Sequence, residues 1–107
     1  MELNQYQIVL VNLDPTIGSE IKKTRPCVII SPDEMNKYLR TIVVAPMTTK
    51  SKNYPTRIKI KHARKIGWIV IDQIRTIDKK RIVKVLGELS HPEIKEVKSM
   101  LRETYVD

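Results

Sequence analysis

Residues 13–31 read LDPTIGSEIKKTRPCVIIS, and the rest of the chain is organised around this stretch. One apolar run ends at Asp14 and a second begins after Pro26, which predicts two strands joined by a polar loop. The loop is too long for a tight hairpin, and Arg25 at its closing edge makes it a candidate rim of a binding or active site. Pro26 favours an extended backbone at Arg25, which helps to fix the direction of the guanidinium. The same residues also fit an ordinary solvated loop.

The length of 107 residues predicts a single domain, residues 1–107, with one core. A content of 41% hydrophobic and 30% charged residues is typical of a soluble globular protein. The chain has no apolar run of membrane-spanning length and no signal peptide at its start, so we expect no membrane contact. Cys27 is the lone cysteine, which excludes an internal disulfide and predicts a reducing, cytoplasmic compartment. Since it lies in an apolar run, we expect a small buried side chain rather than a nucleophile.

The positive charge is concentrated in one region of the chain. The formal net charge is +8, and residues 35–71 contain no Asp or Glu. The cations of this region are Lys37, Arg40, Lys50, Lys52, Arg57, Lys59, Lys61, Arg64 and Lys65. A second cluster at 79–81 lies near Arg75, whereas the tail from residue 91 is nearly balanced. Such an uneven excess favours a nucleic-acid partner over a generally basic surface.

Apolar and β-branched runs predict strands at 7–13, 26–31, 41–47, 56–61, 68–71 and 82–89. Pro46 implies that the third of these lies at a sheet edge or leaves the sheet there. Ser31 is a suitable N-cap for a short helical turn at 32–37. Residues 56–61 alternate, so Arg57, Lys59 and Lys61 are expected on one open strand face.

In the tail, the spacing of the apolar residues changes from that of a strand to that of a helix. Ser90 and Glu93 form a capping-box pattern just before these residues. The fold class predicted by these patterns is mainly β with a C-terminal α-helix, five to seven short strands forming a small barrel.

Several chemistries are not expected from this sequence. His62 and His91 are far apart and lack ligand-like spacing, so a zinc site is not predicted. There is no phosphate-binding glycine loop or dinucleotide fingerprint, and the acids are too scattered for a two-metal cluster. We therefore expect neither a metal nor another cofactor.

Five motifs resemble a known family, and they follow one another along nearly the whole chain. They are LDPTIGSE at 13–20, TRP at 24–26 with SP at 31–32, VAPMTT at 44–49, the Tyr54-Pro55 loop, and DQIRTID at 72–78. Together they look like the MazF/PemK family of toxin endoribonucleases. The resemblance implies an SH3-like or CcdB-like barrel, a homodimer, and metal-independent, sequence-specific cleavage of single-stranded RNA. It also implies a cognate antitoxin, acidic and partly disordered, that neutralises the toxin.

A ribonuclease of this kind uses the 2′-hydroxyl of RNA to attack the adjacent phosphorus, which requires a base, an acid and donors for the phosphorane charge. By resemblance, Arg25 and Thr48 are the first-choice catalytic pair, a guanidinium fork and a hydroxyl donor on one phosphate. Glu20 and Asp72 are the candidate acids, and Asp72 fits a structural carboxylate as well as a base. The residues implied in RNA binding are Ser19, Lys50, Lys52, Arg57, Lys59, Lys61, Gln73 and Arg75.

Two departures from some relatives bear on the mechanism. Ser19 stands where certain members carry His, and Val70 where some carry Arg, so a histidine-assisted mechanism is not expected. Two other functions remain open. One is a gyrase-poisoning toxin on the same fold, which the resemblance disfavours because the only tryptophan, Trp68, is internal rather than C-terminal. The other is a barrel that binds nucleic acid without cutting it.

Overall fold

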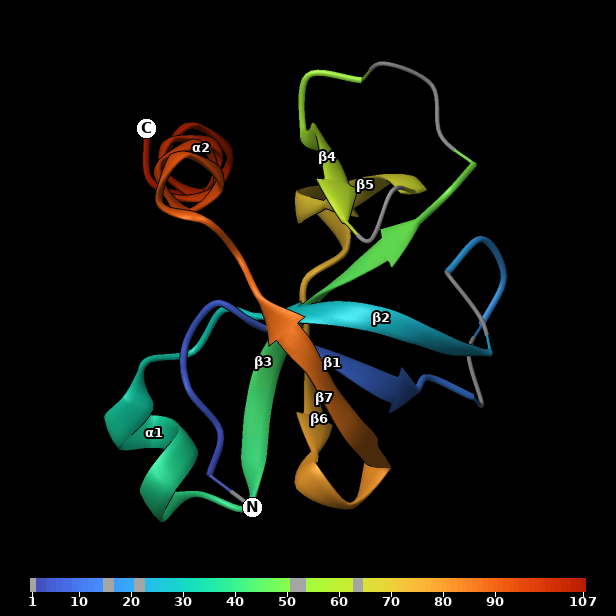
Figure 1. Cartoon of the computed structure of the whole chain (residues 1–107), viewed down its shortest axis with the longest axis vertical. Coiled ribbons are helices and arrows are strands. Elements are labelled where there is room, and N and C mark those ends of the chain that lie inside the picture. Colours follow the sequence, from blue (N-terminus) through green and yellow to red (C-terminus); the bar gives the residue numbers. More distant parts are fainter. Residues whose placement is uncertain (1, 15–16, 21–22, 51–53, 63–64) are drawn as a thin grey trace.

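The computed structural model describes residues 2–14, 17–20, 23–50, 54–62 and 65–107 (Figure 1). Its elements in chain order are β1 (Gln7–Asn12), β2 (Thr24–Ile29), α1 (Asp33–Tyr38), β3 (Thr41–Thr48), β4 (Arg57–His62), β5 (Lys65–Val70), the 3₁₀ turn η1 (Ile71–Gln73), β6 (Arg75–Asp78), the 3₁₀ turn η2 (Lys79–Arg81), β7 (Ile82–Glu88) and α2 (His91–Tyr105). In these residues no helix is long and apolar enough to cross a membrane.

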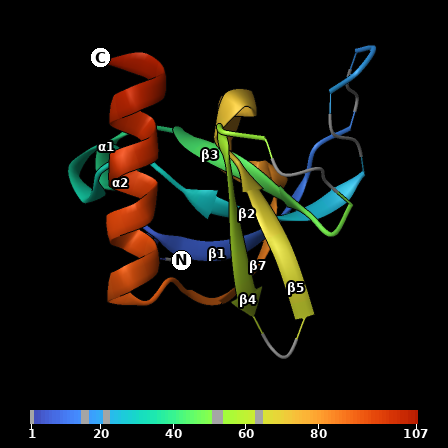
Figure 2. The same cartoon turned by 90° about the horizontal axis from the view of Figure 1, so that it is seen from above.

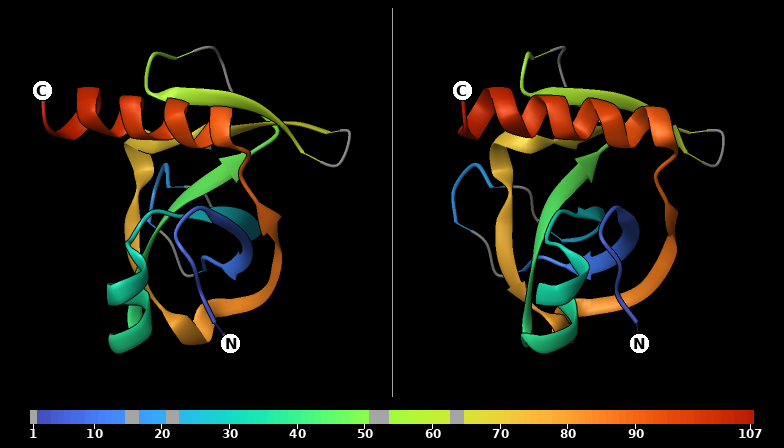
Figure 3. Two further views of the ribbon diagram at one scale, coloured as in Figure 1. Left: turned by 60° about the vertical axis from the view of Figure 1, so that its left-hand side comes forward. Right: turned by 90° about the vertical axis from the view of Figure 1, so that its left-hand side faces the viewer.

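The seven strands form one antiparallel sheet in the order β4-β5-β3-β2-β1-β7, with β6 paired to β3. The sheet curls into a barrel-like shape that is not strictly closed, and α2 runs beside β4 along one side (Figures 2 and 3). The predicted fold class, mainly β with a C-terminal α-helix, is confirmed. Strand β6 was not predicted, because its four residues lie in a polar segment and gain their order from pairing with β3.

Both faces of the curled sheet are buried. Along β1, β2 and β3, neighbouring residues belong alternately to two apolar clusters, as strand geometry requires: Ile8 and Val9, Val28 and Ile29, Val44 and Ala45. The first cluster lies under α2 and includes Ile58, Ile60, Ile69 and Val97. The second fills the barrel interior and includes Val11, Leu13, Cys27 and Ile42. Cys27 is fully buried, as predicted, and this burial raises its pKa to about 12 although the positive charge of Arg75 opposes the shift.

Of the two positions predicted for Pro46, a sheet edge is wrong, because β3 is the central strand, but β3 does change partners at this residue. The carbonyl of Val43 accepts from the N–H of Ile30, so Val43 and, two residues on, Ala45 direct their backbone groups toward β2. Pro46 therefore faces the opposite side. On that side, the pairing of β3 with β6 ends at Val44 and its pairing with β5 begins at Met47. Pro46 lies between the two, so its missing N–H removes no hydrogen bond between strands.

The predicted cap of α1 is also wrong. The N-cap position is Pro32 and carries no side-chain cap bond. The hydroxyl of Ser31 is buried, donates to Oδ1 of Asn36 at 2.5 Å and accepts from the N–H of Val43 at 3.0 Å. Ser31 thus ties α1 to β3 instead of starting the helix.

The capping box of α2 is confirmed. Oγ of Ser90 accepts from the N–H of Glu93 at 3.4 Å, and Oε1 of Glu93 accepts from the N–H of Ser90 at 2.8 Å. At the other end of the helix, the Tyr105 hydroxyl donates to the carbonyl of Ile71 at 2.6 Å. The helix is therefore fixed at both ends, and its last turn is joined to η1.

Candidate active site

A pocket of about 230 Å³ opens where β1, β3 and β6 meet the loop after β1. Its lining residues are Leu13, Glu20, Pro46, Asp72, Gln73, Ile74 and Arg75. The pocket brings together four residues singled out from the sequence: Glu20, Asp72, Gln73 and Arg75. Glu20 lies about fifty positions before the other three in the chain. The pocket combines acids, a cation and an amide around an apolar floor.

The base of the loop after β1 is held by hydrogen bonds at its two ends. The N–H of Leu13 donates to the carbonyl of Lys23 at 3.0 Å, and Oδ1 of Asp14 accepts from the N–H of Lys23 at 2.9 Å. Two arginines reach the same place, Arg75 to the carbonyl of Leu13 at 3.4 Å and Arg81 to the carbonyl of Asp14 at 2.7 Å. These bonds fix the edge of the pocket to β6 and η2.

Glu20 lies in a turn at the tip of this loop. Its N–H donates to the carbonyl of Ile17 at 3.3 Å, and its Oε1 accepts from the N–H of Ile17 at 3.0 Å. Gly18 has φ +60°, a left-handed conformation that disfavours other residues although the space around it is open. Ser19 is exposed in the same turn. Glu20 is exposed too, so its carboxylate is accessible from the pocket side.

Arg25 and Thr48 stand at the open end of the β2–β3 pair. The hydrogen-bonded register ends at Cys27 opposite Pro46, and continuing it by two residues sets Arg25 across from Thr48. The two strands diverge toward this end (Figure 1). Both side chains are half-buried. Oγ1 of Thr48 accepts from the N–H of Lys50 at 3.2 Å and donates to its carbonyl at 3.4 Å, so the hydroxyl is held at the strand end.

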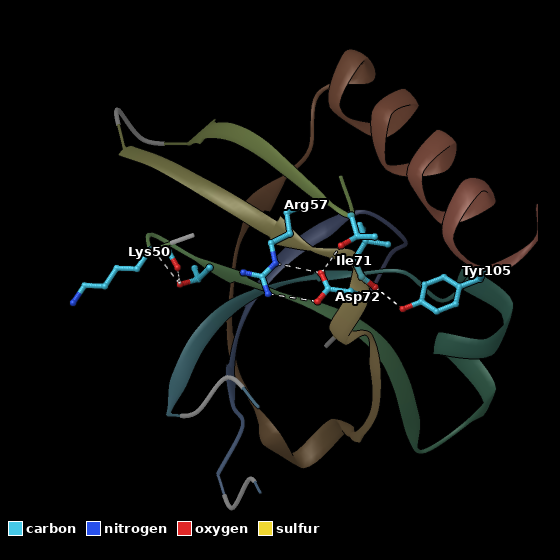
Figure 4. Close-up of polar contacts among 7 residues, drawn as sticks. Lys50, Arg57, Ile71, Asp72 and Tyr105 are labelled. Atoms are coloured by element: carbon cyan, nitrogen blue, oxygen red, sulfur yellow. Dashed lines mark hydrogen bonds and ion pairs between the residues drawn. The ribbon is translucent and has the colours of Figure 1, made fainter. Parts of the chain in front are cut away.

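Asp72 is the centre of a polar cluster (Figure 4). Its Oδ1 accepts from the Thr56 hydroxyl at 2.9 Å and from Nε of Arg57 at 3.3 Å, and its Oδ2 accepts from Nη2 of Arg57 at 3.5 Å. Partial burial alone would raise the pKa of Asp72, but the hydrogen bonds from Arg57 and Thr56 and the charge of Arg57 outweigh it, so the pKa is lowered. A carboxylate held in its charged form is a poor proton acceptor, which favours the structural role of Asp72 over the base.

The contact with Asp72 separates Arg57 from the other two cations of β4, Lys59 and Lys61. Only 17% of the Arg57 side chain is exposed, since the guanidinium faces Asp72 and its Cζ lies 4.9 Å from the centroid of the Tyr54 ring. Lys59 and Lys61 are exposed on the same strand, and Lys50 is exposed beyond β3. The prediction of an open face of three cations therefore holds for the two lysines but not for Arg57. The predicted RNA contact Lys52 lies outside the described residues.

Two aromatic residues near the site escaped the sequence analysis. Tyr54, noted only as part of a motif, lies over Arg57, and Tyr105 reaches the backbone just before Asp72. The Tyr105 contact joins segments far apart in the chain, so no local pattern signals it. Tyr54 lies only three residues before Arg57, in a turn where the N–H of Arg57 donates to the Tyr54 carbonyl at 3.1 Å. Among the described residues, no group of three or more His, Cys, Asp and Glu side chains is arranged to hold a metal ion.

Comparison with known proteins found a matching family model, a sequence relative and two similar solved structures. A sequence model of the family described as PemK-like, MazF-like toxin of type II toxin-antitoxin system matches residues 4–105. An Endoribonuclease MazF of Staphylococcus saprophyticus is 37% identical over 105 residues, covering 92% of this chain and 88% of that protein. Among solved structures, MazF from Deinococcus radiodurans superposes with a TM-score of 0.86 at 24% identity, covering 96% of each chain. An endoribonuclease from a mycobacterial species, solved with its cognate antitoxin, gives a TM-score of 0.80 at 20% identity, covering 94% of this chain and 92% of that one.

Proposed function

Because the chain belongs to the PemK-like, MazF-like toxins of type II toxin-antitoxin systems, we propose that it is an endoribonuclease that cuts single-stranded RNA at a short sequence. The observation that carries the proposal is the pocket in which Glu20, Gln73 and Arg75 meet beside the strand ends bearing Arg25 and Thr48. A carboxylate, a cation and an amide in the pocket, with a guanidinium and a hydroxyl on the two strands that meet at Pro46, are the groups that cleavage of RNA by its own 2′-hydroxyl requires.

Each side chain has a definite part in this mechanism. Arg25 binds the scissile phosphate with its guanidinium fork and stabilises the charge that grows on the phosphorane. The hydroxyl of Thr48 turns from the Lys50 carbonyl to the same phosphate as a donor. Glu20, the accessible acid, accepts the proton of the 2′-hydroxyl. The bond to the 5′-oxygen then breaks and that oxygen takes a proton from water, leaving a 2′,3′-cyclic phosphate and a 5′-hydroxyl.

The remaining candidates act through binding. Asp72 orients Arg57 and is a positioning residue rather than the base. Arg75, Gln73 and Ser19 line or border the pocket and contact the RNA there. The exposed lysines Lys50, Lys59 and Lys61, together with Lys52, hold the phosphates on either side of the cut.

The proposal also concerns partners and location. Solved relatives include a mycobacterial endoribonuclease with its antitoxin and the MazE-MazF complex of Deinococcus radiodurans. We expect an acidic, partly disordered antitoxin to bind this chain too, drawn by the +8 charge, and two copies of residues 1–107, each a single domain, to form a homodimer. An RNA substrate and a reduced Cys27 both fit a cytoplasmic location.

The deciding experiment incubates the purified chain with a long RNA in EDTA and maps the new ends. We expect cuts at one short sequence, cyclic-phosphate and 5′-hydroxyl ends, and no reaction with a substrate that carries a 2′-deoxy sugar at the cut. Cleavage of the deoxy substrate would contradict the mechanism. Binding without any cleavage would instead favour the alternative of a non-cleaving barrel.

Variants separate chemistry from binding. Arg25→Ala should lower single-turnover cleavage by about 10²–10³-fold, the loss of one preorganised donor, with much less effect on RNA affinity. Thr48→Val should behave similarly. Replacing Lys59 and Lys61 should instead weaken binding and flatten its salt dependence, with near-normal cutting at saturating RNA. Arg102→Ala is the matched control, an exposed arginine on α2 outside the pocket lining. Full activity of the Arg25 variant would remove Arg25 from the mechanism.

A further inference from the structure

Trp68 occupies the middle of a row of side chains that crosses three strands. Its partner on β3 is Thr48, and its partner on β4 is Lys59. Residues directly opposite in antiparallel strands share a face and lie close together. The opposite face of the same strands carries Ile58, Ile60 and Ile69, which pack under α2. The row therefore sets an indole ring between the proposed catalytic hydroxyl and the exposed basic strand.

This ring is one of two aromatic side chains that accompany cations here. Nζ of Lys59 lies 5.8 Å from the centroid of Trp68, and Cζ of Arg57 lies 4.9 Å from the centroid of Tyr54. Arg57 and Lys59 are two residues apart on one strand face, which is roughly 6–7 Å along the strand. Successive nucleotides of an extended single strand have a similar spacing. Two cations, each beside an aromatic ring, thus repeat at the interval of the substrate that we propose.

Neither ring serves the core. Trp68 is only half-buried and belongs to neither apolar cluster, and 47% of Tyr54 is exposed. An aromatic ring placed for packing alone would be covered, whereas a partly exposed ring flanked by cations is the arrangement that stacks on bases while the cations take the phosphates. An acidic peptide would use the cations as well, but it has no need of the rings.

We propose that Trp68 and Tyr54 stack on nucleobases of single-stranded RNA, and that Trp68 holds the base beside the phosphate that Arg25 and Thr48 bind. The inference rests on the proposed endoribonuclease function for its substrate, and it assigns the parts of that substrate to named rings. Lys59 turns from the indole toward a phosphate when the base arrives, since its stem is flexible. Stacking of this kind accepts any base, so these rings position the strand while the pocket reads its sequence.

The sole tryptophan makes the test direct, because its fluorescence reports on this one position. The chain is titrated with a single-stranded oligodeoxynucleotide, which cannot undergo 2′-hydroxyl attack, and with the same oligonucleotide carrying abasic residues. We expect saturable quenching by the first, and binding with little quenching by the second. Equal quenching by both, or quenching by an acidic peptide but not by the oligonucleotide, would overturn the proposal.

Variants extend the test to RNA. Trp68→Ala and Tyr54→Ala should each weaken RNA binding by about tenfold or more, whereas Trp68→Phe and Tyr54→Phe, which keep a ring, should stay close to the wild type. The matched control is Tyr38→Ala on α1, where Nζ of Lys37 lies 5.5 Å from the ring centroid of a tyrosine that is 74% exposed. Tyr38 lies just before β3, whose far end carries Thr48. We expect Tyr38→Ala to leave RNA binding unchanged. A loss of RNA binding equal to that of Trp68→Ala would contradict a localised stacking site.

The two proposals fail in different ways. Quenching by the oligonucleotide without cleavage of any RNA would refute the enzyme and leave the stacking site standing. Cleavage by the wild type, with Trp68→Ala and Tyr54→Ala unchanged in affinity and rate, would refute stacking and leave the enzyme. Thermal unfolding of each variant checks that the alanine chains are folded, and if they are not, the fluorescence titration of the wild-type chain with the intact and the abasic oligonucleotide decides the matter.

Discussion

Replacing Asp72 by Asn tests whether this carboxylate acts through Arg57 or as the base. The substitution keeps one acceptor oxygen for Thr56 but removes the charge that strengthens the two bonds from Arg57. A hydrogen bond to a charged group contributes about 1.5–3 kcal/mol, against about 0.5–1.5 kcal/mol for a neutral one. Since 35% of the Asp72 side chain is exposed, solvent weakens its interaction with Arg57, and the loss on substitution lies at the lower end of the difference between these two ranges. We expect the free energy of unfolding to fall by about 1 kcal/mol and Tm by about 5 °C.

The assay compares thermal unfolding of the two chains across pH. The pKa of Asp72 is lower in the folded chain than its ordinary value, so its stabilising contribution is complete above the ordinary pKa of about 3.9. The contribution is lost as pH falls through the lower, folded pKa. The difference in Tm between wild type and variant should therefore be constant near neutral pH and shrink below about pH 4. A difference that grows in acid would contradict this reasoning.

A second ion pair provides the control. Nε of Arg102 and Oδ2 of Asp107 also lie 3.3 Å apart, but 73% and 59% of these side chains are exposed. Asp107→Asn should change Tm by about 1 °C or less, because an exposed pair contributes little. Equal effects of the two substitutions would show that burial and the Thr56 bond add nothing at Asp72.

Cleavage decides the role of Asp72. A residue that positions Arg57 should, when changed to Asn, alter RNA affinity and lower single-turnover cleavage less than about tenfold, with the pH–rate profile unchanged. Loss of a general base would cost about 10²–10⁴-fold at saturating RNA and remove the acidic limb of that profile. The latter outcome would return Asp72 to the catalytic group.

Three further predictions concern the fold. Cys27 should resist alkylation in the folded chain near neutral pH, because burial raises its pKa to about 12, and react rapidly in urea; fast labelling of the native chain would contradict its burial. Val97→Ala should lower the unfolding free energy by about 2 kcal/mol in denaturant titrations, since this side chain of α2 is fully buried against the sheet. Tyr105→Phe should cost about 1 kcal/mol and loosen η1, measured as faster amide exchange at Asp72 and Gln73, because the carbonyl of Ile71 loses its donor.

The sequence was most informative where the signal is local. The β1, β2 and β4 strands, the capping box at Ser90 and the buried Cys27 each follow from alternation or spacing within a few residues. Pro46 was not predicted to lie in a central strand, because its tolerance there depends on which neighbour β3 meets at that point. Arg57 looked like an exposed cation because its partner, Asp72, lies 15 positions further along the chain. Contacts of this kind depend on strand pairing, which a single sequence does not reveal.

The site and the core share one face of the sheet. Val11, Cys27 and Val44 face the barrel interior, and the same side of these strands continues outward to Arg25 and Thr48 and, through β5, to Trp68 and Lys59. The residues proposed to hold the phosphate and the base thus extend from rigid, buried strands, which suits groups that must be fixed before the RNA arrives. Glu20 differs, since it stands on a turn closed by two bonds to the exposed Ile17. Of the proposed catalytic groups it is the one whose position binding can adjust. The position of the proposed general base, Glu20, is therefore fixed only when the substrate fills the pocket. The proposed phosphate site at Arg25 and Thr48 is already fixed by the fold.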